Sequence, residues 1–363
     1  MISVIGAGPA GSHYSALAAK NSEVHLFEEH KIVGKPVACT GILTDSVNDI
    51  IKIPNRLVVS KINRFKIVAP NGKSIYVDLK KTNKVLDRAA FDQYLYNNAI
   101  DKGAKIHLGE KFLGYKNIGK NNYLLKTDKN SYETDMIVGS DGPLSSVAKS
   151  AGIYGNRKYI QGFQVRAKYP NLEEGTTIIR LGLGEFSWIV PETSKIARVG
   201  VVGMNGPKLR KDYEIILKGA EILEHQSGLI PLYDPRQKLR KGKENIFLIG
   251  DAATQVKATT YGGIIYGLLA GKYLSEDKDT YEKTFNKKLG RDLWVSLKMR
   301  DLMNHMDEKQ ADELIAIFEK QSNSKILSEN DRDFPSKFIV QLLMKEAKLW
   351  KLGFGIFKNK LKR

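Results

Sequence analysis

The sequence predicts an α/β fold in which a βαβ domain is interleaved with a mostly antiparallel β-sheet domain and followed by a helical C-terminal region. The chain begins with an apolar strand that runs directly into a glycine motif, ISVIGAGPAG at residues 2–11. Residues 56–82 and 151–239 alternate apolar and polar side chains, as antiparallel strands do. From residue 276 onward the apolar spacing becomes helical.

The glycine motif has the spacing G-x-G-x-x-G, which is typical of a Rossmann-like dinucleotide-binding unit. Gly6 allows the tight turn out of the strand, and Gly8 lets the backbone approach a pyrophosphate. Gly11 lets the next helix pack closely on the sheet. Pro9 and Ala10 lie at the positive N-terminal end of that helix, so we also expect them to contact the pyrophosphate.

The second half of the βαβ unit follows at once. Residues 23–27 form an apolar strand that ends at Glu28. An acidic residue at this place is positioned to accept hydrogen bonds from an adenosine ribose, and we place Glu29 in the same shell. Strand, glycines, helix and acid in this order predict a bound dinucleotide.

A later strand indicates which dinucleotide is bound. The stretch LIGDAA at 248–253 reads as a strand that ends in Gly250-Asp251 at the head of a new helix, with Asp251 bound to a ribityl hydroxyl. Nicotinamide-only enzymes have no such requirement, so FAD is expected. Gly262 and Gly263 permit close backbone approach to the flavin ring, and Ile264 follows them; the alternative is a helix N-terminus of poor propensity.

Two fragments between these motifs complete a recognisable set. Asp87-Arg88 opens a helix, and Asp141-Gly142 follows a buried strand, although each fragment alone is an ordinary cap or turn. Together the motifs resemble the FAD-binding set of the p-hydroxybenzoate hydroxylase superfamily. The resemblance implies that Arg88 reaches the FAD and that Asp141 and Gly142 belong to its shell. Members of that superfamily often carry Arg shortly after this turn, where the present chain has Ala148-Lys149.

Within that superfamily the chain most resembles the geranylgeranyl reductase family, including archaeal digeranylgeranylglycerophospholipid reductases. The family usually shows Tyr where this chain has Phe186, and a third glycine where it has Tyr261. Four stretches carry the resemblance: PVACTG at 36–41, FSWIVP at 186–191, GDAA at 250–253 with its continuation to Ile264, and a helical tail from residue 281.

The resemblance implies reduction of isolated alkenes by reduced FAD. Such an alkene has no carbonyl to polarise, so a proton donor must accompany hydride transfer in a water-free cavity. The resemblance places Cys39 in the active site, with Ala38 beside it near the flavin. Cys39 is the first candidate donor and Tyr261 the second, whereas a lone cysteine elsewhere is most often a small buried residue.

Phe186 and Trp188 alternate on one strand, so both point to one face, and Pro191 ends that strand. We interpret this face as an aromatic wall for a prenyl chain, with faces that stabilise a developing carbocation. Ordinary core packing is the alternative.

The motifs divide the chain into interleaved domains. Residues 1–55, 83–150 and 240–275 carry the FAD motifs, 56–82 and 151–239 form the substrate domain, and 276–363 form the helical region. Asn71-Gly72 predicts a hairpin turn in the substrate domain. No second glycine motif for NAD(P)H is present, so ferredoxin, a deazaflavin and free NAD(P)H remain open as transient electron donors.

Charge and composition limit the partners. Lys and Arg number 58 against 40 Asp and Glu, for a formal charge of +18, which favours anionic partners. The basic residues are scattered without a nucleic-acid-binding module, and the six histidines lack metal-ligand spacing, so neither nucleic acid nor a metal is expected. The single cysteine fits a reducing compartment.

The C-terminal tail suggests where the protein works. Large apolar residues and seven cations interleave over 338–363, a pairing that seats a helix in a membrane interface, although packing on the protein itself has nearly equal weight. With no apolar run near ~20 residues and no signal peptide expected, we predict a cytoplasmic protein that is peripheral on the membrane.

The combined prediction is an FAD-dependent reductase of geranylgeranyl double bonds, acting on a prenylated lipid, most plausibly digeranylgeranylglycerophospholipid. Two alternatives are a flavin monooxygenase or halogenase of the same fold, and a flavoprotein electron carrier without an organic substrate.

Overall fold

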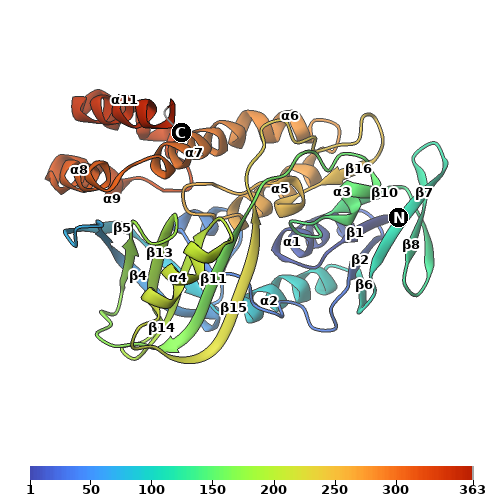
Figure 1. The fold of residues 1–363 in the computed structure, drawn as a ribbon. Coiled ribbons are helices and arrows are strands. Elements are labelled where there is room, and N and C mark those ends of the chain that lie inside the picture. Colours follow the sequence, from blue (N-terminus) through green and yellow to red (C-terminus); the bar gives the residue numbers. More distant parts are fainter. Residues whose placement is uncertain (362–363) are drawn as a thin grey trace. The chain divides into compact units, whose positions relative to one another are not determined.

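The computed structural model describes residues 1–361, and these residues form two compact units that alternate along the chain (Figure 1). The first unit consists of Met1–Val37, Arg88–Lys158 and Ile230–Trp294. The second consists of Ala38–Asp87, Tyr159–Leu229 and the chain from Val295 onward. The last helices are therefore grouped with the second unit, whereas the sequence-based division set them apart from residue 276.

The first unit is built on a five-stranded parallel sheet with the order β16-β10-β1-β2-β6. Strands β1, β10 and β16 are apolar and largely buried, as strands covered on both faces must be. Helix α1 contacts both α2 and α5, which lie beside it in Figure 1. The elements are β1 (Ile2–Ile5), α1 (Pro9–Ala18), β2 (Val24–Glu28), α2 (Arg88–Asp101), β6 (Lys105–Leu108), β10 (Met136–Gly139), β16 (Ile246–Leu248) and α5 (Ile264–Glu276).

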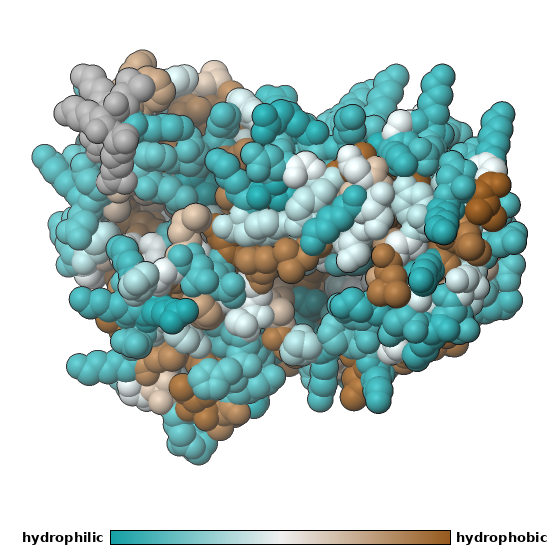
Figure 2. Space-filling model, turned by 45° about the vertical axis from the view of Figure 1, so that its right-hand side comes forward, coloured by the Kyte–Doolittle hydropathy of each residue, from teal (hydrophilic) through white to brown (hydrophobic). Residues whose placement is uncertain are grey.

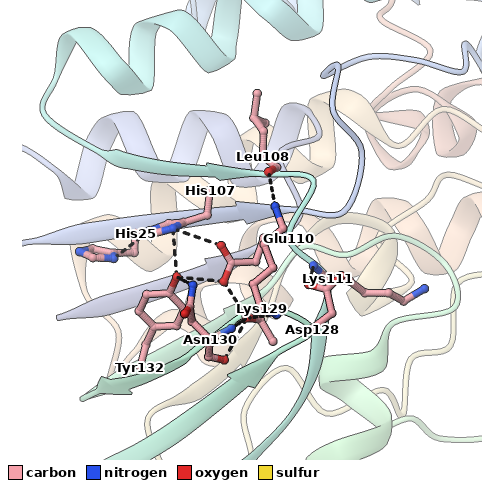
Figure 3. Close-up of polar contacts among 10 residues, drawn as sticks. His25, His107, Leu108, Glu110, Lys111, Asp128, Lys129, Asn130 and Tyr132 are labelled. Carbon is pink, nitrogen blue, oxygen red and sulfur yellow. Dashed lines mark hydrogen bonds and ion pairs between the residues drawn. The ribbon is translucent and has the colours of Figure 1, made fainter.

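A three-stranded antiparallel sheet that the sequence analysis did not predict is inserted in this unit. It comprises β7 (Phe112–Gly119), β8 (Asn122–Thr127) and β9 (Ser131–Thr134). A polar network joins it to β2 and β6 (Figure 3): His107 Nε2 lies 3.0 Å from His25 Nδ1, and Glu110 accepts the Tyr132 hydroxyl at 2.9 Å and the Thr127 hydroxyl at 2.6 Å. Helices α3 (Ser146–Ser150) and α6 (Tyr281–Phe285), a 3₁₀ turn at Gly250–Ala253 and a π turn at Asn286–Gly290 complete the unit.

The second unit is built on an eight-stranded sheet with the order β15-β11-β14-β13-β12-β4-β5-β3. It is mostly antiparallel, as predicted, but β12 runs parallel to β4. The hairpin at Asn71-Gly72 is confirmed, since Gly72 has a φ of 87° between β4 and β5. The strands are β3 (Ile42–Leu43), β4 (Val58–Val68), β5 (Ser74–Leu86), β11 (Tyr159–Lys168), β12 (Thr176–Arg180), β13 (Phe186–Pro191), β14 (Ile196–Gly203) and β15 (Glu221–Pro231).

Helices cover both faces of this sheet. Helix α4 (Pro207–Ile216) packs on one face through Ile216, against a cluster that includes Val165, Ile189 and Val199. On the other face, Ile315 of helix α8 (Glu308–Glu319) packs with Ile75 and Val77. Short 3₁₀ turns lie at Asp45–Asp49, Asn55–Leu57 and Pro335–Lys337.

The C-terminal region is helical, as predicted, and includes α7 (Arg291–Asn304), α9 (Gln321–Glu329), α10 (Ile339–Lys345) and α11 (Ala347–Leu361). Leu352 and Ile356 of α11 are buried against Ile317, and Phe338 and Leu342 are buried against α9. Part of the tail's apolar surface is therefore core. No helix among residues 1–361 is long and apolar enough to cross a bilayer.

Candidate active site

The three glycines of the N-terminal motif have three different surroundings. Gly6 has a φ of 99°, and an added Cβ would lie 2.5 Å from the carbonyl oxygen of Ser140. A Cβ at Gly11 would lie 2.0 Å from the Gly6 oxygen. At Gly8, by contrast, an added Cβ meets no atom of the described chain within 4 Å. Gly6 and Gly11 are thus required by the fold, whereas Gly8 borders open space that suits a close-lying ligand.

The open space lies at the N-terminus of α1. Gly8 is the N-cap residue and makes no side-chain cap hydrogen bond, Pro9 starts the helix, and the first turn holds no acidic residue. The positive end of the helix dipole is therefore not neutralised by the helix itself, which favours a phosphate there. The turn at Gly250 also lies beside this helix N-terminus, because a Cβ on Gly250 would be 3.0 Å from the Ala10 Cβ.

Glu28 connects the end of β2 to the glycine loop. Its Oε2 accepts the Ala7 N–H at 2.8 Å, while Oε1 accepts the His30 N–H at 3.0 Å. Oε1 also lies 2.6 Å from His30 Nδ1, so both of its lone pairs are engaged. The carboxylate is thereby fixed beside the loop, and Oε2 retains a further lone pair for a ribose hydroxyl. Glu29 is directed elsewhere, since it pairs with Lys111 at 3.0 Å in an exposed ion pair.

The segment after β16 differs from its prediction. Gly250-Asp251 heads only a 3₁₀ turn, because Thr254 adopts a left-handed φ of 56° that ends it. The long helix α5 begins at Ile264, with Gly263 as its N-cap. The chain nevertheless folds back, so that a Cβ on Gly263 would lie 2.9 Å from Asp251 Oδ1. Asp251 therefore lies beside a helix N-terminus, as predicted, but that helix begins thirteen positions later in the sequence.

The surroundings of Asp251 shift the pKa of its carboxyl group. Burial raises the pKa of its carboxyl to about 6, against the opposing charges of Arg88 and Arg157. Part of its surface remains exposed. A ligand hydroxyl that donates a hydrogen bond to Asp251 would replace the solvation that burial removes, which is the role the sequence predicts for it.

Arg88 is held by a residue that the sequence analysis missed. Its Nη2 donates to both carboxylate oxygens of Asp92 at 3.0 Å, and both side chains are nearly buried. Burial raises the pKa of Asp92, and the Arg88 charge opposes that shift. The i,i+4 spacing of Arg and Asp on a helix was the signal that could have identified this pair.

Asp141 lies at the end of β10, but its carboxylate is used within the protein. It accepts the Ser145 hydroxyl at 2.6 Å and the Val147 N–H at 3.0 Å, and so caps the start of α3. Gly142 has a φ of 75°, and a Cβ there meets nothing within 4 Å in the described chain. The backbone at Gly142, rather than the Asp141 carboxylate, is therefore open to a ligand.

Arg157 is a second residue that the sequence analysis missed. Its Nη1 donates to the Pro143 carbonyl at 2.9 Å, and its Nη2 donates to the Ala252 carbonyl at 2.6 Å. It thereby joins the turn after β10 to the turn after β16. The chain has no arginine at Ala148-Lys149, but Arg157, which follows later in the sequence, contacts this turn instead.

Buried side chains also hold the backbone of the turn after β16. The Gly250 N–H donates to Gln255 Oε1 at 2.7 Å, and Gln255 Nε2 donates to the Tyr281 hydroxyl at 2.9 Å. That hydroxyl donates to the Leu248 carbonyl at 2.8 Å. Gln255 and Tyr281 are fully buried, so this network fixes the backbone of Gly250 without reaching a ligand.

Tyr261 occupies a strained backbone position. Its φ of 56° is left-handed, which explains physically why glycine is usual at this place in the family it resembles. The neighbouring Gly262 accepts the Lys257 N–H at 3.1 Å through its carbonyl, closing a tight loop. Strain of this kind persists where surrounding structure imposes it, often at functional sites.

Ala38 and Cys39 lie in the second unit. Cys39 is partly exposed, and its Sγ accepts the Gly41 N–H at 3.3 Å. The carbonyl of Thr40 accepts Arg198 Nη1 at 2.5 Å, so the turn around Cys39 is anchored to β14. Ala38 lies against β15, since a Cβ on Gly228 would be 2.8 Å from the Ala38 carbonyl oxygen.

The same unit holds the aromatic residues of β13. Phe186 and Trp188 lie on one face as predicted, with ring centroids 5.8 Å apart. The Trp188 ring occupies the space beside Gly200, where an added Cβ would be 2.4 Å from it. Pro191 ends the strand, and its carbonyl accepts the Ser60 hydroxyl at 2.7 Å.

The turn around Cys39 and the aromatic face share one partner. Gln164 Oε1 accepts the Thr40 hydroxyl at 2.6 Å and the Trp188 indole N–H at 2.9 Å. Gln164 is itself bonded through Nε2 to Gln226. No sequence motif marks Gln164, because β-strand alternation shows only the face on which it lies.

Comparison with known proteins supports the resemblance, although no family model matches the chain. The digeranylgeranylglycerophospholipid reductase 3 of Methanosphaera stadtmanae is 26% identical, with 96% of each chain covered. A solved geranylgeranyl bacteriochlorophyll reductase-like protein from Thermoplasma acidophilum matches with a TM-score of 0.80 at 19% identity, covering 94% of this chain and 98% of the other.

Flavin-dependent enzymes of other kinds share the fold less closely. CmlS, a flavin-dependent halogenase, has a TM-score of 0.62 at 17% identity, with 92% of this chain and 66% of that one covered. The predicted α/β fold and the resemblance to geranylgeranyl reductases are therefore confirmed. The full-length relative is named a reductase, as the predicted enzyme class requires.

Proposed function

We propose that this protein is an FAD-dependent reductase of geranylgeranyl double bonds, with digeranylgeranylglycerophospholipid as its substrate. The full-length similarity to reductases of that name supports the substrate class. The observation that carries the cofactor is the open space at Gly8, at an uncapped helix N-terminus beside the Gly250 turn. This is the arrangement that a dinucleotide pyrophosphate requires.

The residues present fit FAD. The first turn of α1 would hold the pyrophosphate, Glu28 the adenosine ribose, and Asp251 a ribityl hydroxyl. The positive charges of Arg88 and Arg157 act to lower the pKa of Asp251, against the effect of burial. The backbone at Gly142, Gly262 and Gly263 would allow close approach of the ring system.

When bound in its reduced form, FAD supplies a hydride to one alkene carbon. The other alkene carbon must gain a proton, because the alkene itself carries no group to absorb the charge. We assign this proton to the Cys39 thiol, whose Sγ is held in its turn by the Gly41 N–H. Tyr261 is the second candidate, with a hydroxyl as the donor.

The aromatic face of β13 is assigned to the prenyl chain. Phe186 and Pro191 are buried and Trp188 is half-buried, so Trp188 offers the exposed part of this apolar face. The indole N–H of Trp188 is already satisfied by Gln164. Aromatic faces of this kind also stabilise positive charge that develops on the alkene carbon during proton transfer.

The decisive experiment uses the purified protein reduced chemically under anaerobic conditions with a geranylgeranyl lipid. Mass spectrometry should show two hydrogens added for each double bond reduced. Product that forms only with oxygen and halide, or only with oxygen, would instead identify a halogenase or monooxygenase. A reduced flavin that passes electrons onward but leaves every alkene intact would identify an electron carrier.

We further propose that the protein works at an anionic membrane surface on the cytoplasmic side. Several large apolar side chains of α10 and α11 are exposed even though the opposite side of these helices is buried: Val340, Met344, Trp350, Phe354 and Phe357. Exposed lysines at 345, 348 and 351 lie among them. Lys362, Arg363 and the side chain of Lys358 lie outside the described residues.

The wider surface is compatible with such contacts. In Figure 2, long hydrophilic side chains cover most of the visible face, with apolar patches between them. The net charge of +18 would draw the protein toward anionic lipid or toward an acidic electron donor such as a ferredoxin. A deazaflavin or NAD(P)H would serve as a diffusible donor in the same role.

A further inference from the structure

Arg332 carries a guanidinium that the surrounding residues leave without a hydrogen bond. It lies between α9 and the turn at Pro335–Lys337. Its Nε is buried and has no hydrogen-bond partner in the described chain. Its Cζ stands 5.2 Å from the centroid of the Phe65 ring, so its contact with the sheet is a cation–π contact.

The nearby carboxylates are occupied by other groups. Asp331 Oδ1 accepts the Asp333 N–H at 2.8 Å, and Asp333 Oδ2 accepts the Thr44 hydroxyl at 2.7 Å. Burial lowers the pKa of Arg332, and the charges of Asp331 and Asp333 oppose that shift without closing an ion pair. A buried N–H without a bonded partner costs free energy of folding, so the retention of Arg332 Nε at this place needs a reason.

The surface next to Arg332 is apolar and leads toward the aromatic face. Phe65 packs in one cluster with Ile62 and Trp188, and in a second cluster with Ile315. All of these residues belong to the second unit. The partly buried rings of Phe65 and Trp188 therefore pack on one apolar core that reaches the Arg332 guanidinium.

We propose that Arg332 binds the phosphate of a prenylated amphiphile whose hydrocarbon part lies along the apolar surface of Phe65 and Trp188. A guanidinium stacked on an aromatic ring keeps its N–H edge available for a bidentate bond to phosphate. The inference takes the prenyl chain of the ligand from the proposed function and adds a contact between Arg332 and the phosphate headgroup. It distinguishes a lipid phosphate from free phosphate, which has no hydrocarbon part to bind.

The test measures binding, independently of turnover, with geranylgeranyl phosphate, geranylgeraniol and inorganic phosphate as probes. The wild-type protein should bind geranylgeranyl phosphate about tenfold or more tightly than geranylgeraniol, and inorganic phosphate only weakly, because a charge-assisted bond adds to the apolar contact. Arg332→Gln should remove the preference for the phosphate and leave geranylgeraniol binding unchanged. Arg332→Lys should restore part of the preference.

The matched control is Arg64→Gln, since Arg64 lies beside Phe65 on β4 but is exposed and paired with Asp78 at 2.5 Å. It should keep the preference for the phosphate. Arg332→Met should melt at the same temperature as the wild type or higher, because it removes a buried N–H that has no hydrogen-bond partner.

The proposal is overturned if Arg332→Gln retains the preference, if the wild type has none, or if inorganic phosphate binds as tightly as the prenyl phosphate. A protein that shows the preference yet reduces no alkene would disprove the proposed function and leave the headgroup contact standing.

Discussion

Trp188 donates its indole N–H to the same side-chain oxygen of Gln164 that accepts the Thr40 hydroxyl, at 2.9 Å and 2.6 Å. One amide therefore connects the aromatic face of β13 to the residue that follows Cys39. Each bond contributes only about 1 kcal/mol to stability, so the value of the arrangement lies in fixing two side chains relative to each other.

Replacing Gln164 tests this connection. Gln164→Leu should keep the fold but release Thr40 and Trp188, lowering kcat about tenfold because the substrate surface and the proposed proton donor lose their alignment. Gln164→Glu retains the accepting oxygen and should keep most activity. Steady-state kinetics measures the loss of rate, and the change in total tryptophan fluorescence relative to the wild type reports the release of Trp188. Equal rates for the Leu and Glu variants would show that the bonds are purely structural.

The glycine motif yields a contrast between folding and binding. Gly8→Ala should fold with an unchanged melting temperature, because its φ of −67° suits any residue and its Cβ meets no described atom within 4 Å. It should nevertheless weaken FAD binding, because the methyl group enters the space assigned to the pyrophosphate. Gly11→Ala should fail to fold stably, since its Cβ would lie 2.0 Å from the Gly6 oxygen.

Flavin absorbance after gel filtration and melting of the cofactor-free protein separate these two outcomes. If Gly8→Ala retains FAD as the wild type does, the pyrophosphate lies elsewhere.

The Asp251 carboxylate should lower the stability of the cofactor-free protein at neutral pH while it contributes to FAD binding. Its folded pKa of about 6 lies above its ordinary value of 3.8, so burial favours the protonated acid. The cofactor-free protein should therefore gain stability from this group at low pH and lose it as the pH rises through about 6, by up to roughly 3 kcal/mol.

Asp251→Asn removes that penalty and should raise the stability of the cofactor-free protein at pH 7 while weakening FAD retention. Urea unfolding at pH 5 and pH 7, together with FAD titration, measures both. Asp49→Asn is the exposed control. A variant that binds FAD like the wild type would show that Asp251 makes no cofactor contact.

The two candidate proton donors can be separated. Cys39→Ala should retain FAD but lose turnover by about 10²–10⁴-fold, the usual contribution of general acid catalysis. Tyr261→Phe tests the hydroxyl alone, and Tyr261→Gly should stabilise the loop by about 1 kcal/mol by relieving its left-handed φ. If Cys39→Ala turns over normally and Tyr261→Phe does not, the tyrosine is the donor.

Membrane binding should depend on exposed rather than buried residues of the tail. Replacing Trp350, Phe354 and Phe357 by Ser should weaken binding to anionic vesicles without unfolding the protein, because all three side chains are more than half exposed. Binding of the wild type should fall as ionic strength rises.

Deleting residues 337–363 is a poorer test, because it removes Leu352 and Ile356 from a buried cluster. The control for the triple variant replaces exposed Leu113 and Ile118 of β7 by Ser. Cosedimentation in which the triple variant binds as well as the control would place the membrane contact on another surface.

Local patterns were enough to identify the fold and several of its backbone features. The N-terminal glycines, the Asn71-Gly72 hairpin and the alternation of Phe186 with Trp188 depend on backbone geometry within a few residues, and each was predicted correctly. A turn or a strand is specified by residues that are neighbours in the chain, so the sequence displays it directly.

The tertiary structure decided what depends on contacts between distant segments. Arg157 and Gln164 act through partners far along the chain, and no local spacing signals them. The two sides of α11 differ for the same reason, because burial also depends on contacts between distant segments. The sequence shows that Ile356 and Phe354 are both apolar. Only packing decides that Ile356 is buried while Phe354 remains in contact with solvent.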